Sequence, residues 1–185
     1  MQIGVLGGGS WATAIVKILL NNSDHLNWWM RNQNSVDYIN KFHHNPSYLQ
    51  SVDLETEKLT VSTDLEEIVD QSDLLIFAIP SAFMYKTFHE KSFPGIEKKI
   101  GISAIKGIVP EYHAIAARYI HKQFEIPYDQ IGIISGPCHA EEVALERLSY
   151  LTIACQNQTS AKFLADKMAC RYIKTTVSDD IFGTE

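Results

Sequence analysis

The sequence lacks any apolar run of membrane-spanning length, and its first apolar stretch is short. That stretch ends at Gly7, and no basic residue precedes it. A transmembrane helix needs about 20 apolar residues, and a signal peptide needs a basic start before a longer apolar region. We therefore expect a protein without a membrane span and without an export signal.

Positive charge and cysteine are also scarce. Lys and Arg number 16 against 22 Asp and Glu, the formal net charge is -6, and the basic residues form no run. This balance argues against a nucleic-acid partner, which would require a basic face, but it leaves room for a small anionic ligand. Cys138, Cys155 and Cys170 are too far apart for a CxxC zinc or redox motif, so a reducing, cytoplasmic setting is expected.

Metal-ligand spacing, internal repeats and linkers are absent as well. His25, His43 and His44 have no acid or cysteine at ligand spacing, so we predict no metal site. At 185 residues with 45% hydrophobic residues, the chain is long enough to bury one core. One domain is therefore the expected organisation.

Apolar segments alternate along the chain with amphipathic ones. The strand-like segments cover residues 3–6, 26–30, 74–79, 99–105, 131–135, 150–155 and 171–176. Continuous apolar strands separated by helices are typical of a parallel sheet that helices cover on both faces. The predicted fold class is therefore α/β.

Three of the intervening segments carry signals for a helix start. Ser10 is expected to cap the first helix, and Pro110 suits the first turn of another. A third helix is predicted over residues 159–169, with Thr159 or Ser160 as its cap.

The glycine-rich segment GVLGGGSWA joins the first predicted strand to the first predicted helix. Gly7, Gly9 and Ala12 fit the pattern G-x-G-x-x-G/A of dinucleotide-binding folds. In that pattern, the first glycine makes a tight turn, the second lets a diphosphate approach the backbone, and the third small residue lets helix and strand pack closely. The alternative is a glycine-rich turn that only reverses the chain, but its place between strand and helix favours a nucleotide site.

The second strand bears on which dinucleotide would bind. An acid about 20 residues beyond the glycines would hold the ribose hydroxyl of NAD, but here the strand is followed by Arg31 and no acid. A guanidinium can face the 2'-phosphate of NADP or stack on adenine. A solvated charge at a strand end is the alternative interpretation.

Two later loops also follow predicted strands. Lys106, in the segment SAIKGI, would project its ammonium towards a carbonyl or phosphate oxygen. In the segment SGPCHAEEV, Gly136 and Pro137 make a turn, and Ala140 begins a helix whose free N–H groups could receive an anion. Because carboxyl ends of parallel strands form the ligand-binding edge in such folds, both loops are candidate site elements.

The motifs taken together resemble those of bacterial-type NAD(P)-dependent glycerol-3-phosphate dehydrogenase. The matching segments, in the order of the family, are GGGSWATA, WWMRN, NPSYL, FAIPS, SAIKGI, SGPCHAEEV and SDDIFG. This resemblance implies a Rossmann-like, doubly wound, mostly parallel sheet with helices on both faces. It also implies reduction of dihydroxyacetone phosphate, a small phosphorylated substrate, to sn-glycerol 3-phosphate for phospholipid biosynthesis, with NAD or NADP as cofactor.

The resemblance also implies roles for particular residues. The implied cofactor-binding residues are Gly7, Gly9, Ser10, Trp11, Ala12, Arg31, Pro80, Lys106 and Ala140. Lys106, Gly136 and Cys138 would contact the substrate, and Lys106 would also be catalytic. The family usually has Ser or Thr in place of Cys138, and a thiol is the weaker hydrogen-bond donor. Cys138 is not expected to be a nucleophile, because no Cys–His–acid pattern accompanies it.

The resemblance further implies a division of the chain. Residues 1–177 would form the dinucleotide-binding domain, and residues 178–185 would begin a helical substrate domain that supplies the general-acid lysine and the phosphate-binding residues. The 185 residues alone are then expected to bind dinucleotide weakly and to reduce no substrate, and the full-length protein is expected to be a homodimer. The alternatives are another two-domain NAD(P)-dependent keto or hydroxy acid dehydrogenase and a non-catalytic dinucleotide-binding module.

Overall fold

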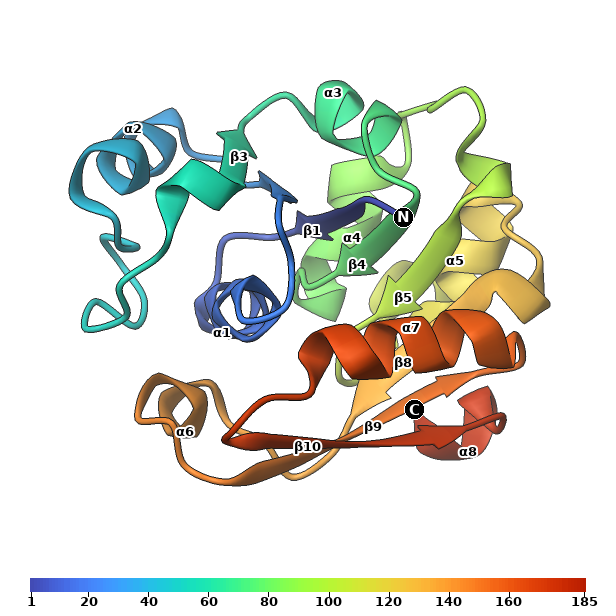
Figure 1. Cartoon of the computed structure of the whole chain (residues 1–185). Coiled ribbons are helices and arrows are strands. Elements are labelled where there is room, and N and C mark those ends of the chain that lie inside the picture. The colour runs from blue at the N-terminus through green and yellow to red at the C-terminus, as the bar shows by residue number, and fades with distance from the viewer.

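Eight strands form one sheet in the computed structural model, which describes residues 1–185 (Figure 1). The strand order is β10-β9-β8-β5-β4-β1-β2-β3, and every neighbouring pair is parallel except β8 with β9. The strands are β1 (Ile3–Leu6), β2 (Leu26–Trp29), β3 (Leu59–Ser62), β4 (Leu74–Phe77), β5 (Ile100–Ser103), β8 (Ile131–Ser135), β9 (Ser149–Cys155) and β10 (Ile173–Ser178). A separate short hairpin pairs β6 (Ile108–Val109) with β7 (Ala114–Ile115). The predicted mostly parallel sheet is confirmed.

Helices cover both faces of this sheet, as Figure 1 shows. The helices are α1 (Ser10–Leu20), α2 (Gln33–Phe42), α3 (Leu65–Asp70), α4 (Ser81–Phe88), α5 (Ala116–Phe124), α6 (Ala140–Ala144), α7 (Gln158–Met168) and α8 (Ile181–Thr184), with short 3-10 turns at Thr56–Lys58, Ile96–Lys98, Pro110–Tyr112 and Tyr128–Gln130. Helices α1 and α7 contribute to one buried apolar cluster, whereas α3, α4, α5 and α8 contribute to the other. None of the helices combines the length and apolarity needed to cross a membrane.

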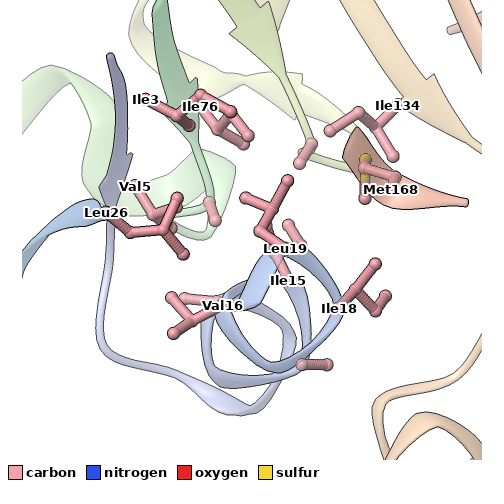
Figure 2. Packing of buried hydrophobic residues seen from close by; sticks show 14 of the residues in the cluster. Ile3, Val5, Ile15, Val16, Ile18, Leu19, Leu26, Ile76, Ile134 and Met168 are labelled. Carbon is pink, nitrogen blue, oxygen red and sulfur yellow. The ribbon is translucent and has the colours of Figure 1, made fainter. Parts of the chain in front are cut away.

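Burial on both faces explains why the central strands are mostly apolar, with Asn27 of β2 and Ser103 of β5 as buried polar exceptions. All four residues of β1, β2, β4 and β5 are buried. On one face, α1 directs its apolar side chains towards the sheet and α7, where they meet Ile3, Val5, Leu26, Ile76 and Met168 (Figure 2). Removal of this apolar surface from water stabilises the fold by about 25 cal/mol per Å². The same packing fixes the start of α1 against the end of β1.

The strand order changes direction at β1. From β1 the chain proceeds outward to β2 and β3, and then crosses to β4 on the other side of β1. Loops that follow β1 and β4 therefore leave in opposite directions, and a crevice opens at the carboxyl edge of the sheet. The loops after β1, β2, β4, β5 and β8 all lie at this edge.

The start of α1 differs from the prediction. Gly9, not Ser10, is the N-cap, and it has extended backbone angles (φ -82°, ψ -176°) with no side-chain capping bond. Ser10 is the first helical residue, so its hydroxyl is past the position from which it could cap. The first turn of α1 consequently keeps its N–H groups free of a capping side chain.

Two other predicted helix starts were also wrong. Pro110 begins a 3-10 turn, which ends at left-handed His113 (φ 48°), and the helix proper starts only at Ala116. Helix α7 is capped by Asn157, whose side chain accepts hydrogen bonds from the N–H groups of Thr159 and Ser160. Thr159 and Ser160 therefore donate backbone N–H groups to the capping side chain, and neither of them is the capping residue.

The end of the chain packs on this same sheet. β10 continues through Ser178, and α8 lies against β8 and β9 with Ile181 buried. Residues 178–185 thus contribute to the packing of the residues that precede them. The expected boundary at residue 177 stays a prediction.

Candidate functional site

Two cavities open at the carboxyl edge of the sheet and meet at the turn between β1 and α1. One cavity, which we call the lysine cavity because Lys106 lines it, has a volume of about 430 Å³. The other, which we call the arginine cavity because Arg31 lines it, has a volume of about 320 Å³. Gly9, Ala78, Ile79 and Pro80 line both cavities. A ligand that spans the turn could therefore occupy both cavities at once.

Most of the predicted site residues line these cavities. The lysine cavity is lined by Gly9, Ser10, Trp11, Pro80, Lys106, Gly136, Cys138 and Ala140. The arginine cavity is lined by Gly7, Gly9, Arg31 and Pro80. Ala12 lines neither cavity, because it lies on the buried side of α1 and is part of the apolar core. The structure therefore brings together residues from the loops after β1, β2, β4, β5 and β8.

The turn between β1 and α1 requires glycine at its first position. Gly7 has a φ of +138°, a region that residues with a side chain rarely adopt. A Cβ added at Gly7 would lie 2.4 Å from the carbonyl oxygen of Ala78. Gly7 therefore permits β1 and β4 to stay paired up to the point where the chain turns into α1.

All three glycine carbonyls of the turn accept hydrogen bonds from buried side chains. Trp28 Nε1 donates to the oxygen of Gly7 over 2.6 Å, and Asn45 Nδ2 donates to the oxygen of Gly8 over 3.3 Å. Thr13 Oγ1 donates to the oxygen of Gly9 over 2.9 Å. Because these carbonyls bond inward, the turn is held in one conformation before any ligand arrives.

The N–H groups of the same turn are available to a ligand. No hydrogen bond to another group of the chain is donated by the backbone N–H of Ser10, Trp11 or Ala12. A Cβ added at Gly9 would meet no atom within 4 Å, so bare backbone borders open space there. Free N–H groups at the positive end of an 11-residue helix, beside a glycine, suit a diphosphate.

Arg31 and its neighbours make the second cavity a site for polar and aromatic groups. The Arg31 side chain is exposed and forms no ion pair, and no Asp or Glu lines the arginine cavity. Two exposed aromatic side chains, Tyr48 and Phe83, also line it. The cavity thus offers one free cation and two rings to a planar, anionic ligand.

Lys106 is the cation of the first cavity. It follows β5, its side chain is exposed, and Gly107 behind it is left-handed (φ +89°). It forms no ion pair with another residue of the chain. Its ammonium is therefore free to meet an oxygen of a ligand in the lysine cavity.

Comparison with known proteins assigns the chain to a family. Residues 2–161 match the family described as the N-terminus of NAD-dependent glycerol-3-phosphate dehydrogenase. The chain belongs to this family. Over 184 residues it is 32% identical to a glycerol-3-phosphate dehydrogenase [NAD(P)+] of Oceanobacillus iheyensis, a match that covers 100% of this chain and 53% of that relative.

Solved structures agree with this assignment. Glycerol-3-phosphate dehydrogenase of Plasmodium falciparum superposes with a TM-score of 0.86 and 28% identity, covering 98% of this chain and 53% of that one. The enzyme of Saccharomyces cerevisiae, at 24% identity, shares the fold with a TM-score of 0.84, covering 98% of this chain and 57% of that one. The chain spans about half the length of the curated relatives it matches.

The loop after β8 holds Cys138 in a buried position. Burial raises the pKa of the Cys138 thiol, so the thiol is protonated at neutral pH. A protonated, buried thiol is a poor nucleophile and only a weak hydrogen-bond donor. Gly136 has a structural reason for its identity, since a Cβ there would lie 2.4 Å from the carbonyl oxygen of Tyr150 on β9.

Several residues of the site were not predicted from the sequence. Asn45 is buried and joins its loop to the glycine turn, because its Nδ2 donates to Thr13 Oγ1 while its Oδ1 accepts from the N–H groups of Ser47 and Tyr48. Phe83 and Glu185 each line a cavity. The segment NPSYL was recognised as a motif, but nothing local to it indicates a bond to Gly8, 37 residues away.

Proposed function

We propose that this chain is the dinucleotide-binding part of an NAD(P)-dependent glycerol-3-phosphate dehydrogenase, an oxidoreductase that reduces dihydroxyacetone phosphate to sn-glycerol 3-phosphate. The observation that carries the proposal is the free first turn of α1 beside Gly9, placed where the two cavities meet. Membership of the family supports the same assignment.

The residues of the two cavities favour one orientation of a bound dinucleotide. The N–H groups of the first turn of α1 would hold the diphosphate, with Gly9 leaving room for it. The arginine cavity would take the adenosine half, because Arg31 suits a 2'-phosphate and the rings of Tyr48 and Phe83 suit a purine. The lysine cavity would take the nicotinamide half and the substrate.

Lys106 has the clearest role in the chemistry. When bound, the reduced nicotinamide supplies a hydride to the carbonyl carbon of the substrate. Negative charge then grows on the carbonyl oxygen, and the Lys106 ammonium stabilises it. A fixed cation beside a developing oxyanion contributes on the order of 3 kcal/mol in a site that excludes water. Gly136 and Cys138 would border the substrate in the same cavity.

The substrate and Lys106 are tested together. In the complete gene product that carries this sequence, NADPH oxidation is expected to be faster with dihydroxyacetone phosphate than with 2-keto acids. Lys106→Met should lower kcat by about 100-fold, because it removes the cation but keeps most of the side-chain length. Lys162→Met, a change on the exposed side of α7, is the matched control. A preference for 2-keto acids would assign the protein to another dehydrogenase class.

Arg31 is expected to select between the two dinucleotides. Titration of the chain with NADPH and NADH, followed by fluorescence, should show that Arg31→Asp weakens NADPH on the order of 100-fold, since a charge-assisted pair is replaced by repulsion. NADH lacks the 2'-phosphate and should lose about tenfold or less, from the lost stacking on adenine alone.

The control for Arg31→Asp makes the same change of net charge at a residue outside both cavities. Lys162→Asp alters the net charge by the same amount at a residue that lines neither cavity. It should leave both affinities unchanged. Equal losses for NADPH and NADH in Arg31→Asp would show that Arg31 does not face the 2'-phosphate.

The proposed reaction also carries a proposed setting. Its product is a precursor of glycerophospholipids, so we place the protein in phospholipid biosynthesis. The three widely spaced cysteines favour the reducing cytoplasm as its location. We infer a homodimer for the full-length enzyme and no nucleic-acid partner.

A further inference from the structure

We propose that Glu185 accepts a hydrogen bond from the carboxamide NH2 of the bound nicotinamide and thereby fixes the orientation of that group. The inference rests on the proposed function, because it places the nicotinamide in the lysine cavity. Glu185 lines that cavity. Hydrogen bonds from Ser103 at the end of β5 and Ala117 at the start of α5 hold its carboxylate in place.

The segment that carries Glu185 is held firmly on the sheet. Ile181 is 1% exposed, and the Phe182 ring meets the Tyr128 ring edge-on at a centroid distance of 5.5 Å. The Arg118 guanidinium lies 5.7 Å from the centre of the same Phe182 ring. The backbone N–H of Glu185 continues α8 by donating to the carbonyl of Ile181. These contacts define where the carboxylate can lie.

The carboxylate bridges the end of β5 and the start of α5. Ser103 Oγ donates to Glu185 Oε1 over 3.3 Å, and the N–H of Ala117 donates over 3.2 Å to Oε1 and 3.3 Å to Oε2. Ser103 is fully buried, and α5 has no capping bond from its own N-cap, Ile115. Glu185 therefore occupies the positive end of a nine-residue helix.

These partners leave acceptor positions on Glu185 unfilled. A carboxylate has about four lone-pair positions, and three donors lie close to it here, namely Ser103 Oγ and the N–H groups of Ala117 and Ala116. Burial raises the pKa of the Glu185 carboxyl, while the hydrogen bonds from Ala117, Ser103 and Ala116 lower it. A partly buried carboxylate gains from each further donor that reaches it.

The chemistry around Glu185 favours an amide over a phosphate. Its negative charge would repel the phosphate of a substrate, whereas the NH2 group of a carboxamide donates hydrogen bonds that a carboxylate accepts. The neighbouring lining includes the apolar side chains of Ile105 and Ile133, which suit the face of a pyridine ring. The other acid of the cavity, Glu141, is exposed on α6 and would meet water instead.

The first test uses the unmodified chain and three ligands. NADH carries the carboxamide, the reduced 3-acetylpyridine analogue has a methyl ketone without an N–H in its place, and ADP-ribose lacks the ring. Calorimetric titration should give an affinity for NADH about tenfold higher than for the analogue, as expected for the loss of one hydrogen bond to a charged acceptor. Equal affinities for NADH and the analogue would overturn the inference, and this comparison requires no variant to fold.

The second test changes the acceptor. In Glu185→Gln, the amide oxygen can keep the bond to Ala117 while the NH2 group faces the cavity, so NADH should bind about tenfold more weakly. The analogue and ADP-ribose should change by about twofold or less, because neither donates to residue 185. Glu97→Gln makes the same chemical change at an exposed residue that lines neither cavity and should leave all three affinities unchanged.

The outcomes separate this inference from the proposed function. An equal loss for all three ligands in Glu185→Gln would show that Glu185 acts only by holding α8 and α5, and it would overturn the inference alone. A failure of the unmodified chain to bind any of the three, ADP-ribose included, would overturn the proposed function and the inference with it.

Discussion

Gly9→Asp is expected to abolish dinucleotide binding without destabilising the fold. Gly9 has the extended backbone of an N-cap, and a side chain there would meet no atom within 4 Å. An aspartate would bond the free N–H groups of the first turn, as Asp64 does at the start of α3. It would also place negative charge where we expect the diphosphate. The affinity for NADH and NADPH should fall at least about 100-fold, while capping should raise the free energy of unfolding by roughly a few tenths of a kcal/mol.

The comparison with Gly9→Asn separates charge from space. Asparagine caps a helix about as well as aspartate and fills the same volume, but it adds no charge. It should also weaken binding, with a smaller dependence on salt concentration than the aspartate variant shows. Titration calorimetry for the ligands and urea unfolding for the protein measure both quantities. Unchanged affinity in a folded Gly9→Asp protein would place the diphosphate elsewhere and remove the basis of the proposed function.

The strands of this fold could be predicted where burial dictates their composition. β1, β2, β4, β5 and β8 are buried at nearly every position, so most of their residues are apolar and the strands stand out from the segments between them. β3 was not predicted, because this edge strand alternates buried and partly exposed residues over only four positions. The antiparallel pairing of β9 with β8 also leaves no local signal, since it depends on the path of the chain through α6.

Helix starts were less predictable, because several polar residues near each start could cap it. At α7 the acceptor is Asn157, one position before the helix and two before Thr159. At α1 the capping position has no side chain at all. A local rule that seeks the nearest hydroxyl therefore selects Ser10, although Gly9 leaves the N–H groups free for another partner.

Site residues could be predicted when they directly follow a strand. Gly7, Arg31 and Lys106 come after β1, β2 and β5, and the parallel sheet places such residues at one edge. Asn45 and Glu185 could not be found in this way. Their positions depend on contacts with residues that are distant in the chain, such as the bond from Glu185 to Ser103, 82 residues earlier.

Gly7→Ala is expected to cause the largest loss of stability of any alanine substitution at a glycine in this chain's cofactor turn. The new Cβ would lie 2.4 Å from the carbonyl oxygen of Ala78 and 2.8 Å from its carbonyl carbon. Both are backbone atoms in the loop that leaves β4, so no flexible side chain can move aside. The positive φ adds a cost of about 1–3 kcal/mol, and the clash must part β1 from β4 or distort the turn. We expect the free energy of unfolding to fall by about 3 kcal/mol or more.

Gly95→Ala serves as a control for an alanine at a positive φ without a clash. Gly95 also has a positive φ, +84°, but a Cβ there would meet no atom within 4 Å. Gly95→Ala should therefore lower the free energy of unfolding by only about 1 kcal/mol, and it should leave dinucleotide affinity unchanged. Urea unfolding of both variants gives the comparison. Equal losses of unfolding free energy in the two variants would mean that β1 and β4 can separate next to Gly7 at little cost. The glycine turn would then not hold the two cavities in a fixed relative position.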